Sequence, residues 1–265
     1  LLWNTGRPAE AEAEYRRAVE IQEKLAADHP AVTEFRSSLA SIHNNLGLLL
    51  LETGKPTEAD AEFRRALEIG QKLAADNPKV PVHRNAVASC HNNLSVILRR
   101  LGRPAEARDG CDQAIAIREA LIQQVPKVLE YRNLLAYSLR RRGLARSDLG
   151  DPAGAAADAR RAIALWEGLS SRRGEVWFET ACAHAALASL AGRAGSGVSA
   201  TEAVTEADAA MALIRKAIEM GYRAVDSSRT EDALDSLRSR DDFPLLMMDL
   251  EFPSDPFAPD TDGHR

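Results

Sequence analysis

Cysteines, aromatic residues and long apolar runs are all scarce in this chain. Only three cysteines occur in 265 residues, and they form no Cys-x-x-Cys pair, so a disulfide framework is not indicated and the redox compartment stays open. Aromatic residues make up 5% of the sequence and β-branched residues are few, which disfavours a sheet protein. No run of about 18 apolar residues occurs, so we expect no membrane-spanning helix and no membrane contact by this segment.

The sequence also shows no sign of catalysis. No Ser/His/Asp arrangement or carboxylate pair stands out, and the glycine-rich stretch 192–197 lacks the Lys-Ser/Thr that a phosphate loop requires. The formal net charge of −5 argues against a dedicated nucleic-acid-binding protein, which is usually basic. We therefore predict a chain that is not an enzyme, needs no cofactor or metal ion and does not bind nucleic acid.

The first residues, Leu1-Leu2-Trp3-Asn4, include no methionine, no signal peptide and no helix cap. We expect the chain to be a fragment of a longer protein. Its location stays open between the cytoplasm and attachment to a membrane-anchored parent protein.

A 48-residue repeat is the main feature that is present. Gly6, Gly54, Gly102 and Gly150 each stand 48 residues apart. The first three begin the related segments Gly-Arg-Pro-Ala-Glu-Ala, Gly-Lys-Pro-Thr-Glu-Ala and Gly-Arg-Pro-Ala-Glu-Ala, and the fourth begins a degraded copy. The segment His-Asn-Asn-Leu at 43–46 recurs at 91–94 with the same step. Such regular self-similarity indicates a repeat architecture.

Each repeat is predicted to form two helices. Apolar residues at a three-or-four spacing indicate one amphipathic helix from Pro30 to about Thr53 and a second from Pro56 to about Asp76. Gly54 suits the left-handed end of the first helix, and Pro56 suits the first turn of the second. The short connection makes the two helices antiparallel. Because one pair cannot bury both of its faces, we predict an all-α fold, a right-handed α-solenoid of antiparallel helix pairs.

The repeats set the expected domain organisation. A repeat array is predicted for residues 1–222, and a capping segment for residues 223–252, in which Leu234, Leu237, Phe243, Leu246 and Leu250 would cover the last repeat. Residues 253–265, rich in Pro and Asp, are expected to be disordered. Within the array we expect the second helix of repeat one at 7–28, repeats at 30–77, 78–125 and 126–173, and a divergent repeat at 175–222.

These patterns resemble the tetratricopeptide repeat. Repeat two has Leu46-Gly47, Leu50, Ala59, Phe63 and Ala66 in the register of that family, with His43 where the family prefers Trp. Repeat three has Ser95 in place of the glycine and Cys111 in place of the aromatic residue. Each helix is about two turns longer than in the usual repeat of about 34 residues. The long helices and the Asn-Asn-Leu segments look most like repeats of the kinesin-light-chain type.

The resemblance implies a concave groove lined by the first helix of each repeat, in which a partner protein or an extended peptide is bound. Asn can pair with the backbone of such a peptide, and Arg can bind carboxylates, so an acidic or C-terminal peptide would fit. The alternative is that the asparagines brace neighbouring repeats. The candidate binding residues that face this groove by register are Asn44, Asn45, Asn92, Asn93, Arg99, Arg140 and Arg141.

Two more specific sites are disfavoured. The carboxylate clamp known in this family needs Lys and Asn where this sequence has Asn44 and Leu48. His43 and His91 lie on separate repeats, roughly 10 Å apart by the width of a helix, which is too far to share a zinc ion. We expect them to be core histidines.

The repeats and the C-terminal segment Asp242-Phe243 … Asp249-Leu250-Glu251-Phe252-Pro253 are also similar to the C-terminal regions of bacterial serine/threonine kinases of the eukaryotic-like type. The chain has neither the His-Arg-Asp catalytic loop nor the Asp-Phe-Gly motif of a kinase. Two functions therefore stay open. The chain is either a scaffold that binds a peptide or partner protein, or the sensory or substrate-docking arm of a membrane-tethered kinase whose catalytic domain lies outside it.

Overall fold

The computed structural model describes residues 7–170, 172–222 and 231–251. Within them the secondary structure is entirely helical, as the repeat pattern predicted. The chain divides into two compact units, Leu1–Gly150 and Asp151–Arg265. The predicted repeat 126–173 spans the boundary between them.

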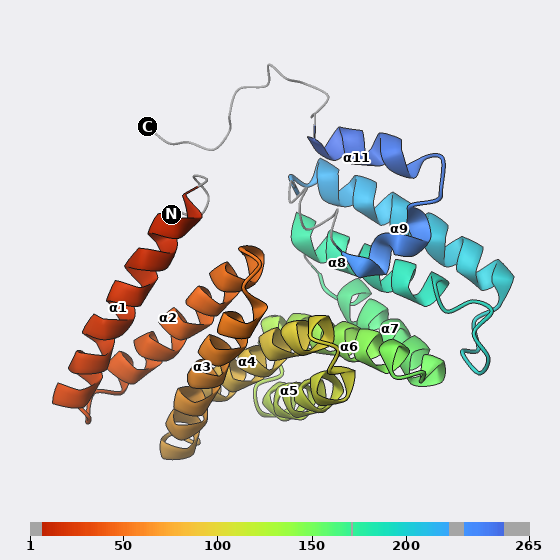
Figure 1. The fold of residues 1–265 in the computed structure, drawn as a ribbon. Coiled ribbons are helices and arrows are strands. Elements are labelled where there is room, and N and C mark those ends of the chain that lie inside the picture. Colours follow the sequence, from red (N-terminus) through yellow and green to blue (C-terminus); the bar gives the residue numbers. More distant parts are fainter. Residues whose placement is uncertain (1–6, 171, 223–230, 252–265) are drawn as a thin grey trace. The chain divides into compact units, whose positions relative to one another are not determined.

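The first unit is a run of six helices, each packed against the next (Figure 1). The second helices of the repeats are α1 (Pro8–Asp28), α3 (Pro56–Asp76) and α5 (Pro104–Gln124), and the first helices are α2 (Thr33–Glu52), α4 (Pro81–Arg100) and α6 (Leu129–Asp148). α4 also contacts both α2 and α6, so the first helices of successive repeats lie side by side. The unit therefore has the stacked helix hairpins of a solenoid.

Local backbone chemistry explains the end of α2. At the end of α2, Gly54 has a φ of +77°. The N–H of Lys55 donates to the carbonyl of Leu50 (2.8 Å) and that of Gly54 to the carbonyl of Leu51 (3.2 Å). This pair of bonds is a Schellman cap, which requires a residue that tolerates the left-handed conformation.

The predicted start of the first helix at Pro30 is wrong. α2 begins at Thr33, and the N–H of Val32 donates to the carbonyl of His29 over 2.9 Å. Pro30 is therefore the second residue of a turn, a position for which its fixed φ is equally suitable. The same turn precedes α4, because the N–H of Val80 donates to the carbonyl of Asn77 (3.0 Å).

A core of small and large apolar residues joins the hairpins of the first unit. Phe63 is fully buried and packs among side chains from both helices of repeats two and three. The members of this core are Leu46, Leu50, Ala59, Phe63, Leu94, Ile97, Leu98, Ala107 and Ala145. Because the core runs from one hairpin to the next, no hairpin buries its apolar faces alone.

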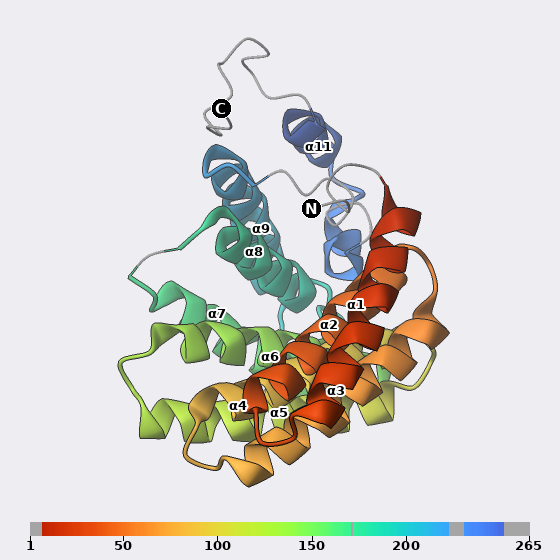
Figure 2. The same cartoon turned by 90° about the vertical axis from the view of Figure 1, so that its left-hand side faces the viewer.

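The second unit contains α7 (Pro152–Glu167), α8 (Gly174–Ala188) and α9 (Ala200–Glu219), with α8 and α9 side by side (Figures 1 and 2). The short helix η2 (Asp232–Leu237) packs on α8, and α11 (Phe243–Glu251) packs on α9. Of the residues expected to cap the last repeat, Leu234, Leu237, Phe243 and Leu246 are buried. The side chain of Leu250 and the tail predicted for 253–265 lie outside the described residues.

Candidate functional site

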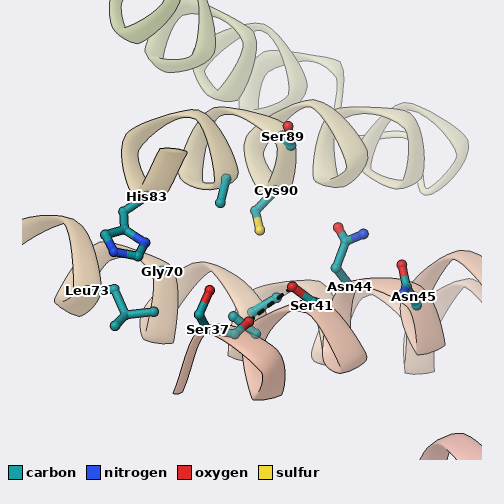
Figure 3. A pocket seen from close by; sticks show the side chains of 12 residues that line it. Ser37, Ser41, Asn44, Asn45, Gly70, Leu73, His83, Ser89 and Cys90 are labelled. Atoms are coloured by element: carbon teal, nitrogen blue, oxygen red, sulfur yellow. Dashed lines mark hydrogen bonds between the residues drawn. The ribbon is translucent and has the colours of Figure 1, made fainter. Parts of the chain in front are cut away.

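A pocket of about 390 Å³ lies between α2 and α4, the first helices of repeats two and three, and α3 contributes to its wall. Figure 3 shows Asn44 from α2 and Cys90 from α4 directed into the space between these helices. The wall is made mostly of small and polar residues, with Leu73 as its one large apolar side chain, and it has no carboxylate or guanidinium group. The lining residues are Ser37, Ala40, Ser41, Asn44, Asn45, Ala66, Gly70, Leu73, His83, Ala86, Ser89 and Cys90.

Gly70 on α3 keeps this pocket open. It is buried in the middle of a helix, where glycine costs about 1 kcal/mol relative to alanine, so its presence is not explained by helix formation. A Cβ atom on Gly70 would meet only Cγ2 of Val87, at 3.4 Å. A larger side chain at this position would extend into the space that is now open.

The two asparagines predicted on α2 both line the pocket. Nδ2 of Asn93 on α4 donates to Oδ1 of Asn44 over 2.8 Å, which joins repeat two to repeat three. Asn45 is exposed and has no hydrogen-bond partner within the described part of the chain. Asn44 and Asn93 thus brace neighbouring repeats, as the alternative proposed, while Asn45 keeps its amide available at the pocket.

Asn92 and Arg140 do not lie where the sequence placed them. They are only 6% and 2% exposed, so the expectation that they face an open groove needs correction. Oδ1 of Asn92 is buried without a hydrogen-bond partner among the described residues. Because positions one residue apart on a helix point about 100° apart, a small error in register exchanges a groove residue for a core residue.

The remaining predicted arginines are partly buried. Nε and Nη2 of Arg99 donate to the two carboxylate oxygens of Asp148 over 2.6 and 3.3 Å, which joins α4 to α6. Arg141 is half-buried. The guanidinium group of Arg99 is therefore already engaged by a carboxylate of the chain itself, which reduces its use for an acidic ligand.

His43 belongs to a buried polar pair that the sequence did not reveal. The side chain of His43 is 2% exposed, and its Nδ1 lies 2.6 Å from Oε2 of Glu62 on α3. Arg65 donates to the other oxygen of Glu62 over 3.0 Å. The second unit has a similar pair, His184 and Glu206. Within the described residues no three His, Cys, Asp or Glu side chains are grouped so as to hold a metal ion.

The cysteines of the first unit lack the environment of a nucleophile. Burial raises the pKa of Cys90 to about 11 and the pKa of Cys111, on α5, also to about 11. Because the thiolate is the reactive form, both side chains are inert near neutral pH. Among the described residues, none of the helices combines the length and the apolar character needed to cross a membrane.

The signal that would have located the pocket is present in the sequence. Gly70 shares its place in the 48-residue repeat with Gln22 and Arg118, so one repeat lacks a side chain where its neighbours have long ones. The prediction was instead based on the recurring His-Asn-Asn-Leu segments, and it therefore selected the asparagines. The pocket lies at a position where the repeats differ in side-chain volume.

Several solved structures are similar to the chain, whereas no curated protein sequence matches it. One is BtubC (BKLC) from P. vanneervenii, at 18% identity over 81% of this chain and 93% of that one, with a TM-score of 0.48. Another is a thermophilic TPR protein from Thermus thermophilus, which is 21% identical over 88% of this chain and 93% of that one, with a TM-score of 0.46.

Family models give a more direct assignment. Models described as tetratricopeptide repeat match residues 1–31 and residues 38–120. The matched residues contain α1 and most of the three helices that surround the pocket. The helix hairpins, the glycine caps and these matches agree: the chain contains tetratricopeptide repeats, which have the fold of a protein-interaction scaffold.

Proposed function

We propose that the first unit binds an extended peptide of a partner protein along the adjoining helices α2 and α4, with one peptide side chain in the pocket over Gly70. The observation that carries this proposal is the pocket itself, which lies between the first helices of two repeats and has the exposed Asn45 in its wall. A pocket that takes one side chain, beside an amide that can bind main chain, has the two elements needed to recognise an extended segment.

Asn45 supplies the main-chain contact in this proposal. Its side-chain amide offers both a donor and an acceptor and can therefore pair with a peptide N–H and C=O together. Asn44 supports the same surface indirectly, since its bond to Asn93 holds α2 and α4 at the spacing that leaves the pocket open. The remaining candidates, Asn92, Arg99, Arg140 and Arg141, are buried or partly buried and have no direct contact in this proposal.

An array of immobilised 12-residue peptides of diverse sequence, probed with the purified full chain, tests the proposal. Peptides that bind should lose at least about tenfold in affinity when Asn45→Ala removes two hydrogen bonds to the main chain. Gln123→Ala, which removes an exposed amide from α5, is the matched control and should leave the affinity unchanged. Equal binding by the wild type and Asn45→Ala would refute the role of Asn45, and a complete lack of binding peptides would refute the peptide groove.

The kinase-associated alternative rests on the similarity of the repeats and of residues 242–253 to the C-terminal regions of bacterial kinases. In that case the groove would dock a substrate or sense a ligand for a catalytic domain outside this chain. Reading the coding sequence upstream of Leu1 separates the two functions. A kinase catalytic loop there supports the docking arm, whereas further repeats alone support an independent scaffold.

A further inference from the structure

One position of the second helix recurs through the first unit and faces the first helix that follows it. In the first unit it is occupied by Gln22 on α1, Gly70 on α3 and Arg118 on α5, each 48 residues after the one before. Nε2 of Gln22 donates to the main-chain carbonyl of Phe35 over 3.1 Å. Gln22 and Arg118 thus both donate hydrogen bonds to the following first helix. Gly70 has no side chain and donates no such bond.

Arg118 shows what this space can hold. Its side chain is 1% exposed and lies at the contact of α5 with α4 and α6. Nη1 donates to the carbonyl of Leu134 over 3.0 Å and to Oγ of Ser138 over 2.5 Å, and Nη2 donates to Oγ of Ser89 over 3.2 Å. Burial lowers the pKa of Arg118 to about 10, so the guanidinium still carries its proton at neutral pH. The repeat therefore contains a built site for a buried guanidinium.

Two of the three acceptors recur at the pocket one repeat earlier, a serine hydroxyl and a main-chain carbonyl, and a thiol replaces the second hydroxyl. The positions 48 residues before Ser89, Ser138 and Leu134 are Ser41, Cys90 and Ala86. All three line the pocket. The pocket therefore corresponds to the Arg118 site without its arginine, because Gly70 contributes no side chain to it, and the thiol of Cys90 stands where Ser138 has its hydroxyl.

The hydroxyl groups are also oriented for a donor. Ser138 Oγ donates its own proton to the carbonyl of Leu134 over 3.2 Å, which leaves its lone pairs for Arg118. Ser41, the counterpart of Ser89, also donates its own hydroxyl proton, to the carbonyl of Ser37 over 3.0 Å (Figure 3). The lone pairs of Ser41 can therefore accept a hydrogen bond from a group inside the pocket.

We propose that the pocket over Gly70 receives the guanidinium group of an arginine carried by the bound peptide, in the place that Arg118 fills from within the chain one repeat later. This inference rests on the proposed function and names the residue that the groove selects. Since no carboxylate lines the pocket, recognition depends on hydrogen bonds to Ser41, Ser37 and main-chain carbonyls and not on an ion pair. A planar guanidinium with five donors meets such dispersed acceptors better than the single ammonium of lysine.

The test uses the isotope-labelled full chain and the peptide acetyl-Ser-Thr-Ser-Arg-Ser-Thr-Ser-amide, with matched peptides that carry Lys, citrulline or Ala at the central position. The arginine peptide should give saturable shifts of the backbone amide signals of Gly70, Ser41 and Cys90. Its affinity should exceed that of the Ala and Lys peptides by at least about tenfold, because Ala loses every bond that the guanidinium donates and the ammonium of Lys does not reach the dispersed acceptors together. Equal affinity of the arginine and Ala peptides would overturn the proposal.

Two variants separate filling of the pocket from other effects. Gly70→Arg should place a guanidinium in the pocket from within and abolish binding of the arginine peptide. Gly70→Ala adds only a Cβ atom that meets Val87 at 3.4 Å and should bind as the wild type does. Binding by Gly70→Arg equal to that by Gly70→Ala would refute the inference. Some array peptides could depend on Asn45 and yet contain no arginine. If such peptides still bound Gly70→Arg, the arginine pocket would be refuted and the peptide groove would stand.

Discussion

A Cβ atom on Gly47 would lie 2.9 Å from Cζ of Phe63, closer than a real Cβ contact allows. Gly47 on α2 thus makes room for the aromatic ring of α3, and Phe63 is fully buried as a result. One repeat later the corresponding residues are Ser95 and Cys111, a larger side chain opposite a smaller one. A larger residue at the first position is thus matched by a smaller residue at the second, which keeps the interior close-packed in both repeats.

Gly47→Ala is predicted to destabilise the chain by about 1–3 kcal/mol, because the new methyl group overlaps a ring that the core holds in place. Chemical denaturation measures the change. Gly70→Ala is the matched control, since both are buried helical glycines, and it should instead stabilise by up to about 1 kcal/mol through helix propensity. Stabilisation by both substitutions would show that the Phe63 ring moves aside at no cost.

Gly54→Ala is predicted to destabilise by about 1–2 kcal/mol for a different reason. The φ of Gly54 is +77°, and nothing lies within 4 Å of a Cβ built there, so the cost comes from the backbone alone. Gly54→Asn should cost less, because Asn tolerates the left-handed region better. Thermal unfolding of the two variants would give this order, and the reverse order would contradict the cap.

The Asn44–Asn93 bond is predicted to contribute about 0.5–1.5 kcal/mol to stability. A double-mutant cycle with Asn44→Ala and Asn93→Ala, followed by urea unfolding, isolates this coupling. A coupling energy near zero would mean that the bond does not brace the repeats. Asn45→Ala, one position away and without such a bond, should change the free energy of unfolding little.

Acidification is predicted to destabilise the chain in part through His91. Burial lowers the pKa of His91 below its ordinary value of 6.5. The unfolded chain therefore binds a proton at a pH where the folded chain does not, so stability is complete above pH 6.5 and is lost as the pH falls below it towards the folded pKa. His91→Gln should reduce this slope in denaturation curves measured between about pH 7.5 and 5. An unchanged slope would assign the effect to other groups.

The thiols of the first unit are predicted to resist modification in the native state. At mildly alkaline pH the raised pKa values of Cys90 and Cys111, both about 11, leave little thiolate, and both side chains are buried. A disulfide reagent such as dithiobis(nitrobenzoate) should react slowly with them and should titrate all three cysteines once denaturant is added. Fast reaction of Cys90 or Cys111 in the folded chain would contradict their burial.

The periodic residues made the helix pairs predictable. The site could not be predicted in the same way, because periodicity does not report the exact helix ends or which side chains are buried. Gly54 indicated the helix end correctly because few residues tolerate its conformation. Pro30 misled because proline suits both the first turn of a helix and the second position of a turn. Arg140 was expected to face the groove because of its register in the repeat, yet it is buried, since register alone does not report which neighbours a side chain has.

The pocket could not be predicted from the similarity between repeats. It arises where the repeats differ, at Gly70, and its lining becomes meaningful only when the contacts of Arg118 are known. A comparison of equivalent positions for side-chain volume would have marked Gly70 as an opening. The chemistry of that opening required the hydrogen bonds of Ser41 and Ser138.

Two polar contacts between first helices, in the part of the chain that the structure describes, have a consequence for how the first unit comes apart. Asn44 pairs with Asn93 and Arg99 with Asp148, each across a single junction between repeats. Each junction therefore has its own polar contact, and breaking the contact at one junction leaves the contact at the other junction intact. Amide hydrogen exchange should then proceed in stages from the outer hairpin inwards, so the unit would release a bound segment by peeling and not by a concerted opening.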